Sequence, residues 1–272
     1  MLTVIGAGGF IGARLTQELE RRGVSYRAPG RHERLAGRSL GDVVHCAGVT
    51  GDFRTRPLDT VAAHVGAVET LLRTSDMRSI VYLSSTRVLR GAGVGREDDA
   101  LRLAPADPDH LYDLSKALGE ALVLASGVPA LVLRLSNVYG IDLVSRTFLA
   151  SVLQDALRDG EVLLRTALDS TRNYVGVDDV VAAIMALMER GARGIHHVAG
   201  DRAVSHGELM QVVAALTGCT VRVADGAPTE VAPDIDIARV RAAIGFEPES
   251  VIDALPRLVE GYRNALSAER RG

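Results

Sequence analysis

The stretch that decides the fold is Leu2-Thr3-Val4-Ile5-Gly6-Ala7-Gly8-Gly9-Phe10-Ile11-Gly12, a short apolar run that leads into glycines. Residues 2–5 are typical of a buried strand, and residues 11–22 of an amphipathic helix. A turn from a strand into a helix offers free backbone N–H groups and the positive end of the helix dipole to an anion. Glycine at such a turn lets a phosphate, or the strand behind it, come close. The GxxGxxG spacing therefore predicts a dinucleotide site, with cofactor contacts from Gly6, Gly9, Phe10, Ile11 and Gly12.

Short apolar runs alternate with amphipathic stretches along the chain. Strands are predicted at residues 42–46, 80–84, 131–135 and 195–199, and helices at 60–73, 111–125 and 178–190. Strands alternating with helices indicate an α/β fold, a doubly wound parallel sheet of the Rossmann type. We assign residues 1–140 and 178–200 to this domain. Residues 141–177 and 201–272, with shorter helices and Pro-containing turns, are expected to form a smaller C-terminal substrate-binding lobe. The long segment 90–110 is either a lid or substrate wall, or an exposed connection.

The composition excludes several classes of protein. The 272 residues are 47% hydrophobic and carry 31 basic and 34 acidic side chains, with no basic stripe, so a globular protein without a nucleic-acid partner is expected. Two cysteines, Cys46 and Cys219, are too few for a disulfide framework or a four-ligand zinc site, so no metal is expected. The N-terminus lacks a charged leader, and the apolar runs are shorter than a bilayer span. We expect a cytoplasmic protein without a membrane partner.

One residue stands out by its rarity, because 30 of the 31 basic residues are arginine and Lys116 is the only lysine. Tyr112 precedes it by four residues, on the same face of the predicted helix. A phenol with an ordinary pKa near 10 is a poor acid or base at neutral pH unless a nearby cation stabilises its anion. A surface pair is the alternative, but a lone lysine in this position argues against it. We predict that Tyr112 and Lys116 act together.

Hydroxyl groups end the predicted strand 80–84, at Ser84, Ser85 and Thr86. Ligands of parallel sheets bind at the carboxyl ends of the strands, where a serine can hold a substrate oxygen in line with the phenol. The same hydroxyls could instead cap a turn.

The choice of cofactor is expected at the end of the second strand, where an acid would bond the adenosine ribose. Gly30 occupies this place and Arg31 follows. A guanidinium would pair with a 2′-phosphate, so NADP(H) is favoured and NAD(H) remains possible. The alternative is that Arg31 lies on an ordinary surface turn.

Together with Leu133-Arg134-Leu135-Ser136-Asn137-Val138-Tyr139-Gly140 and Arg172-Asn173-Tyr174-Val175-Gly176, these motifs resemble an extended short-chain dehydrogenase/reductase. More narrowly, the chain resembles the NAD-dependent epimerase/dehydratase group, which acts on nucleotide sugars. The resemblance implies that Tyr112 is the acid/base, that Lys116 binds the nicotinamide ribose and lowers the tyrosine pKa, and that Ser85 is the catalytic hydroxyl. It also implies a homodimer formed through helices 60–73 and 111–125. The implied substrate contacts, to a nucleotide-diphosphate sugar, are Ser85, Thr86, Asn137 and Arg172.

The chain departs from the family pattern in four places, one of which is Leu135, where a proline is common beside the nicotinamide. Residues 31–42 are too few for the usual extra helix and third strand, so this edge of the sheet is expected to be trimmed. His64 stands where the family usually has a helix asparagine, and we assign it no role. Residues 231–234 lack the phosphate-binding arginine of many nucleotide-sugar enzymes.

The residues around the hydroxyl also bear on the reaction. Thr86-Arg87 stands where family dehydratases carry Asp-Glu, which disfavours dehydration. Arg31 favours NADPH consumed as a reductant, so the leading hypothesis is a ketoreductase acting on a keto deoxysugar nucleotide. The alternatives are a nucleotide-sugar epimerase with tightly bound NAD and a ketoreductase of a small natural product. A cofactor-sensing regulatory protein is disfavoured, because such proteins can dispense with the tyrosine and the lysine.

Overall fold

The computed structural model describes residues 1–49, 51, 53–144 and 147–269. Its largest sheet is parallel throughout and has the strand order β10-β6-β4-β3-β1-β2. The six strands are β1 (Leu2–Ile5), β2 (Tyr26–Arg27), β3 (Ser39–His45), β4 (Asp76–Ser85), β6 (Ala130–Leu135) and β10 (Gly194–Val198). Each strand predicted from the sequence is present, within a few residues of its expected bounds.

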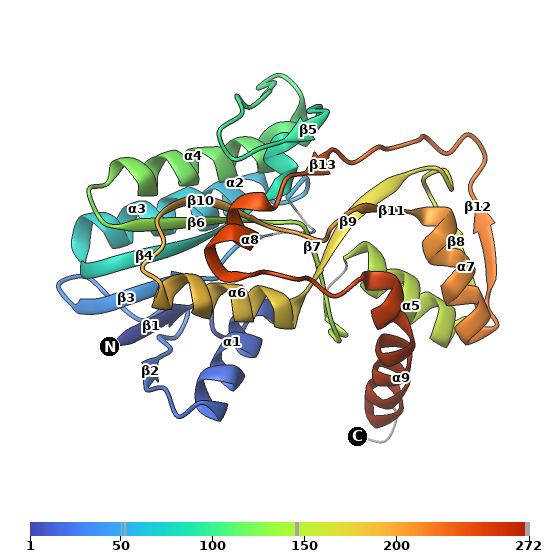
Figure 1. Cartoon of the computed structure of the whole chain (residues 1–272), viewed down its shortest axis with the longest axis horizontal. Helices are drawn as coiled ribbons and strands as arrows, with labels where there is room; N and C mark the ends of the chain where they lie inside the picture. Colours follow the sequence, from blue (N-terminus) through green and yellow to red (C-terminus); the bar gives the residue numbers. More distant parts are fainter. Residues whose placement is uncertain (50, 52, 145–146, 270–272) are drawn as a thin grey trace.

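Helices cover both faces of this sheet (Figure 1). One face carries α1 (Phe10–Arg21) and α6 (Val177–Glu189), and the other carries α4 (Leu111–Ala125) together with α2, η1 and α3. The predicted helix 60–73 consists of three pieces, namely α2 (Pro57–Val61), the π-helical turn η1 (Ala62–Gly66) and α3 (Ala67–Thr74). The prediction of a doubly wound α/β fold is confirmed.

The edge of the sheet at β2 is short, as the sequence predicted. The chain passes from β2 to β3 through residues 28–38 without a helix or a strand. A crossover connection that carries its own helix needs roughly 10 to 12 residues or more. Part of this segment is taken up by turns, so too few residues remain for a helix. β1 therefore pairs with β3 on one side and with the two-residue β2 on the other.

The remaining elements lie mostly to the right in Figure 1. A three-stranded sheet has the order β11-β9-β7, and two pairs join β12 to β8 and β13 to β5. The strands are β5 (Val94–Gly95), β7 (Asn137–Tyr139), β8 (Glu161–Leu164), β9 (Thr171–Gly176), β11 (Ala203–Ser205), β12 (Thr220–Val223) and β13 (Asp234–Ile235). The helices are α5 (Phe148–Arg158), α7 (His206–Thr217), α8 (Ala238–Ile244) and α9 (Val251–Glu269), with 3₁₀ turns η2 (Thr86–Leu89) and η3 (Pro108–His110).

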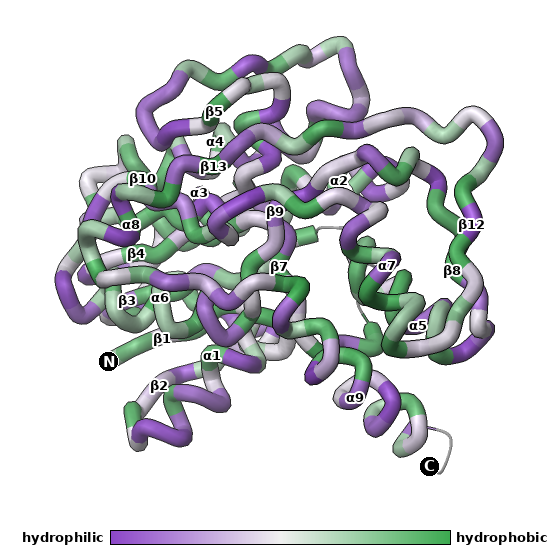
Figure 2. Tube along the Cα trace, turned by 45° about the vertical axis from the view of Figure 1, so that its right-hand side comes forward, coloured by the Kyte–Doolittle hydropathy of each residue, from purple (hydrophilic) through white to green (hydrophobic). Residues whose placement is uncertain are grey.

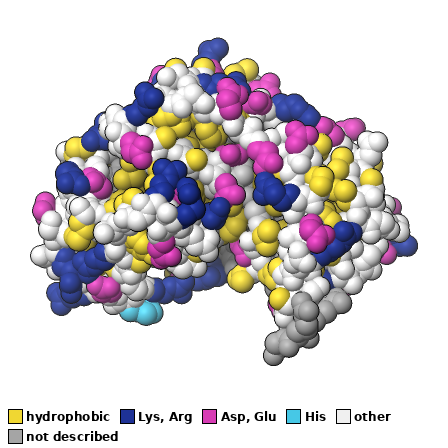
Figure 3. Space-filling model, turned by 60° about the horizontal axis from the view of Figure 1, so that its bottom comes forward, with side chains coloured by type: hydrophobic (Ala, Val, Ile, Leu, Met, Phe, Trp, Pro, Cys, Tyr) yellow, Lys and Arg dark blue, Asp and Glu magenta, His cyan; other side chains and the backbone are white. Residues whose placement is uncertain are grey.

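Separate apolar cores lie beneath these two groups of elements. Two clusters line the faces of the large sheet, and a third joins α5, α7 and α9 with β8. Along α9, hydrophilic and hydrophobic residues alternate (Figure 2), which is the pattern of a helix with one buried face. On the face seen in Figure 3, a notch separates the body that carries the large sheet from the part built from α5, α7 and α9.

One segment lies elsewhere than the sequence analysis placed it. Residues 235–246 were assigned to the smaller lobe, but Ile235, Ile237, Val240 and Phe246 are buried in the core of the large sheet. Here α8 packs beside α6 and β10. The apolar spacing of this short helix gave no information on which core it joins.

Cys46 and Cys219 are free thiols. Among the described residues, no helix is both long and apolar enough to cross a membrane.

Candidate active site

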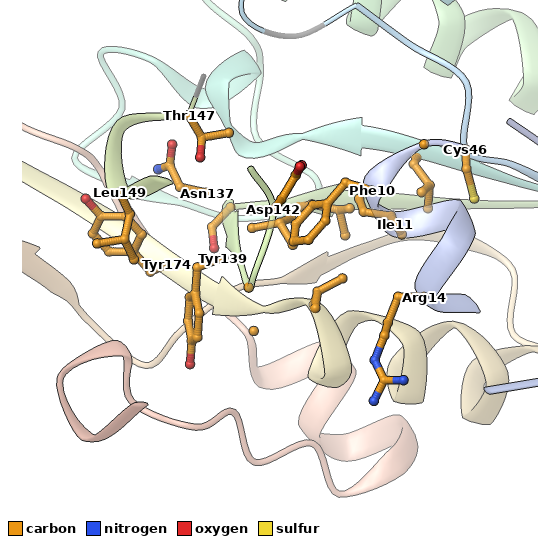
Figure 4. Close-up of a pocket in the computed structure, with 18 of the residues that line it drawn as sticks. Phe10, Ile11, Arg14, Cys46, Asn137, Tyr139, Asp142, Thr147, Leu149 and Tyr174 are labelled. Carbon is orange, nitrogen blue, oxygen red and sulfur yellow. The ribbon is translucent and has the colours of Figure 1, made fainter. Parts of the chain in front are cut away.

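A cavity of about 1040 Å³ opens at the carboxyl edge of the large sheet. Its wall is formed by the glycine turn and the start of α1, the segments that follow β3, β4 and β6, the first turns of α4, and parts of α5, α6 and α9. In Figure 4, Phe10 and Ile11 lie on one side, and Asn137, Leu149 and Tyr174 on the other. Because ligands of parallel sheets bind at this edge, the cavity is the candidate active site.

The glycine turn fits a pyrophosphate. Gly6 has a φ of +79°, and a Cβ there would lie 2.7 Å from the backbone nitrogen of Ala47. Gly9 is the N-cap of α1 and, without a side chain, leaves the first amides of that helix uncapped. Gly8, Gly9, Phe10 and Ile11 line the cavity. Uncapped N–H groups at a helix N-terminus bind phosphate, so these residues can hold a dinucleotide.

Tyr112 lies in the first turn of α4, is only 5% exposed and lines the cavity. Burial raises the pKa of its phenol. The positive charge of Arg87 and a hydrogen bond with the Ser85 side chain act in the opposite direction. Tyr112 and Ser85, predicted from separate motifs, therefore lie near each other in the cavity wall.

Lys116 lies one helical turn further along α4 and is also buried. Its ammonium donates a hydrogen bond to the Leu83 carbonyl at 2.9 Å and lies 5.9 Å from the centre of the Tyr112 ring. Burial lowers the pKa of Lys116 to about 8. The bond to Leu83 holds the only lysine beside the end of β4, within the cavity wall.

The three adjacent hydroxyl residues at the end of β4 differ in their contacts. Ser84 donates to the buried Glu120 carboxylate at 2.5 Å, so its hydroxyl is engaged in the interior. Ser85 accepts a hydrogen bond from the Arg87 amide and contacts Tyr112. Thr86 lines the cavity as the first residue of η2. Of the three, Ser85 is the one whose hydroxyl lowers the pKa of the Tyr112 phenol.

His64, to which the sequence analysis gave no role, lies against Tyr112 with ring centres 5.2 Å apart and edge to face. Its Nε2 accepts a hydrogen bond from the Val49 amide, and its Nδ1 lies 2.8 Å from the Ser115 hydroxyl. Because Ser115 donates to the Tyr112 carbonyl, Nδ1 is the donor in this pair. Burial lowers the pKa of His64 to about 3, so the ring is neutral and joins the segment after β3 to the first turn of α4.

The predicted substrate contacts divide into two groups. Asn137 lines the cavity and is exposed, and its side chain donates to the Asn173 carbonyl at 2.8 Å. Arg172 is not among the described residues that line the cavity. Its guanidinium stacks on the Phe148 ring at 5.0 Å and pairs with Glu230 at 3.1 Å. Arg172 thus reaches the cavity only through Phe148, which does line it.

Arg31 is exposed in the segment after β2 and lies outside the wall of the cavity formed by the described residues. The neighbouring Arg27 is paired with Glu33. The segment 90–110, predicted as either a lid or an exposed connection, contributes no described residue to the wall. Instead it pairs with β13 through β5 and buries Glu97.

The sequence analysis missed three arginines that line the cavity, namely Arg14, Arg87 and Arg257. Arg14 on α1 lines the cavity and is hydrogen-bonded to Asp178 on α6. Arg87 lines it two residues after Ser85. The sequence contains one signal for Arg87, its place two residues after the predicted catalytic hydroxyl Ser85.

The sequence model of the NAD dependent epimerase/dehydratase family matches residues 34–200 of this chain. The chain belongs to this family. It is an NAD(P)-dependent oxidoreductase or epimerase of the extended short-chain dehydrogenase/reductase type, as the motifs predicted.

Named relatives include reductases of nucleotide sugars. A dTDP-4-dehydro-6-deoxy-D-allose reductase from a Streptomyces species is 26% identical over 313 residues, covering 96% of this chain and 95% of the relative. A dTDP-4-dehydrorhamnose reductase of Mycobacterium tuberculosis is 30% identical over 223 residues, covering 75% of this chain and 71% of the relative. The structure of MoeE5 in complex with UDP-glucose and NAD superimposes with a TM-score of 0.85 and 26% identity, covering 97% of this chain and 99% of that one.

Proposed function

We propose that this enzyme is an NADPH-dependent ketoreductase that reduces a keto group on a deoxysugar nucleotide. The observation that carries the proposal is that the buried Tyr112 and the half-buried Ser85 lie together in the wall of a cavity that also contains the glycine turn. The reductases among the relatives support the choice of reduction over other reactions of the family.

The nicotinamide, when bound, supplies the hydride. The residues of the chain supply the proton and the geometry. Ser85 holds the substrate oxygen by a hydrogen bond, and Tyr112 donates its phenolic proton to that oxygen as the carbonyl becomes an alcohol. Lys116 binds the ribose next to the nicotinamide and favours the phenolate that remains. The glycine turn and the open amides of α1 bind the pyrophosphate.

The preference for NADPH is argued from Arg31. Its guanidinium follows the short edge strand β2, and no carboxylate among the described residues forms an ion pair with it. A free guanidinium in this position would pair with a 2′-phosphate. We propose Thr86, Asn137 and Arg172 as contacts to the sugar nucleotide.

The test is the consumption of NADPH or NADH by the purified protein in the presence of dTDP-linked 4-keto-6-deoxysugars. We expect oxidation of NADPH with formation of the alcohol, and a loss of about 10²- to 10⁴-fold in kcat for Tyr112→Phe. Full turnover by that variant would refute the mechanism. Protein that carries stoichiometric NAD and interconverts sugars without added reductant would be an epimerase instead.

We also propose a homodimer formed through the predicted helices 60–73 and 111–125, which in the structure are the segment α2, η1 and α3, and α4. These helices pack side by side, and each exposes large apolar side chains, with Leu58 83% exposed on α2 and Leu118 55% exposed on α4. Light scattering should give twice the mass of the chain for the parent protein, and a smaller mass for Leu118→Arg. A monomeric parent protein would refute the proposal.

A further inference from the structure

A stack of rings and guanidinium groups that the family resemblance did not predict borders the cavity through Arg87 and Tyr112. Arg87, in η2, places its guanidinium 5.1 Å from the centre of the Tyr112 ring and 5.0 Å from that of Phe53. A cation within about 6 Å of a ring centre is attracted to the negative face of the π-system. When the phenol ionises the ring becomes more negative, so this attraction increases.

The position of Arg87 is fixed from the other side by Asp113. The Arg87 Nε lies 3.1 Å from an oxygen of this carboxylate, which is 1% exposed. Arg90 also reaches Asp113, at 3.4 Å. Asp113 is the sequence neighbour of Tyr112, and its negative charge raises the pKa of the phenol. The Arg87 guanidinium therefore both pairs with the carboxylate and faces the phenol ring.

The charged and titratable groups around Tyr112 come from four elements. Arg87 faces its ring from η2, Asp113 and Lys116 belong to α4, His64 packs edge-on from η1, and Tyr82 lies on β4. His64 is neutral, since burial holds its pKa near 3. Lys116 is hydrogen-bonded to the Leu83 carbonyl. Two cations, Arg87 at 5.1 Å and Lys116 at 5.9 Å from the ring centre, are thus near a phenolate at Tyr112.

We propose that Arg87 is a positioning residue that stabilises the phenolate form of Tyr112, in addition to Lys116, by holding a positive charge against the ring while it pairs with Asp113. The inference rests on the proposed function only in taking Tyr112 as the acid. It agrees with the pKa of Tyr112, on which Arg87 is the largest lowering influence, ahead of the Ser85 hydrogen bond. It also explains why a charged side chain borders the cavity two residues after the hydroxyl.

The test compares Arg87→Met with Arg90→Met in the full-length protein. Each variant removes one partner of Asp113, but only Arg87 faces the Tyr112 ring. The ionised fraction of Tyr112 is followed across alkaline pH as the difference in phenolate absorbance between each protein and the same protein carrying Tyr112→Phe. Melting curves at each pH ensure that only folded protein is compared.

We expect the pKa of Tyr112 to be higher in Arg87→Met than in Arg90→Met by about one unit, the low end of the roughly 1 to 3 units that an opposite charge within about 4 to 6 Å supplies. Arg87→Lys should restore part of this difference, because it keeps the charge without the planar stacking group. Equal values in the two methionine variants would overturn the proposal. So would a Tyr112 that stays protonated in all the folded proteins, because Arg87 would then stabilise no phenolate.

The titration needs no substrate, so its result is independent of whether the protein reduces keto sugars. Turnover by Tyr112→Phe, in contrast, would refute the proposed function and leave the titration readable. The two failures are therefore distinguishable.

Discussion

Gly12 offers a sharp test of how the glycine turn is built. A Cβ at this position would lie 2.9 Å from the Ala7 Cα and closer still to the Gly6 oxygen. Both neighbours are backbone atoms, so neither can move by a change of rotamer. Gly12→Ala therefore requires α1 to move away from the turn that follows β1.

Overpacking of this kind costs about 1 to 3 kcal/mol, and a clash with two backbone segments belongs at the upper end. At roughly 2 to 4 °C per kcal/mol for a chain of this size, a loss of about 3 kcal/mol lowers Tm by about 6 to 12 °C. The displacement of α1 also moves the amides that would bind phosphate, so the affinity for NADPH should fall as well.

Gly8→Ala is the matched control. A Cβ on Gly8 would meet no atom within 4 Å, although Gly8 lines the cavity. We expect this variant to melt like the parent protein but to bind NADPH more weakly, because its methyl group occupies space that the phosphate needs. Thermal denaturation and titration calorimetry measure the two effects separately. If Gly12→Ala melted within about 2 °C of the parent, a change of less than about 1 kcal/mol, the close approach of α1 to the turn would be wrong.

Three further predictions concern buried charges. The buried Glu120 carboxylate lies 2.7 Å from the Arg134 guanidinium and loses this partner in Arg134→Met, so urea denaturation should show a free energy of unfolding lower by about 3 to 5 kcal/mol. Adding Glu120→Gln should recover much of this loss. If it recovered none, an ionic origin of the loss would be contradicted. Burial lowers the pKa of His45 to about 4, so the unfolded chain binds a proton more readily than the folded one, and the free energy of unfolding should fall as the pH drops from 6.5 towards 4. In His45→Leu this fall should be smaller by on the order of 2 to 3 kcal/mol. Parallel pH profiles of the two proteins would refute this assignment. Burial lowers the pKa of Lys116 to about 8, so its positive charge opposes folding below that pH, and the free energy of unfolding should increase as the pH rises from 8 towards 10.5. Lys116→Met should therefore be more stable than the parent protein at pH 7, yet less active. A variant that is less stable than the parent at pH 7 would refute this account.

Much of the fold could be predicted from the sequence because its signals are local. The helix 111–125 and the strand 2–5 have the predicted bounds, and each follows from apolar periodicity within the segment itself. The glycine turn is encoded in the same way, because φ and close approach are requirements of single residues. The pairing of Tyr112 with Lys116 depends only on their separation by one helical turn.

The tertiary structure decided what depends on residues far apart in the chain. Residues 235–246 return to the large sheet, and Arg172 lies against Phe148 rather than in the cavity wall. The stack of Phe53, Arg87 and Tyr112 brings together three segments whose sequences share no periodicity. Periodicity reports which face of an element is apolar, whereas contacts between loops depend on the packing of the elements that carry them. The sequence thus determined the turn, the phenol and the lysine of this enzyme, and the packing of the loop after β3 against η2 and α4 determined the charges that surround the phenol.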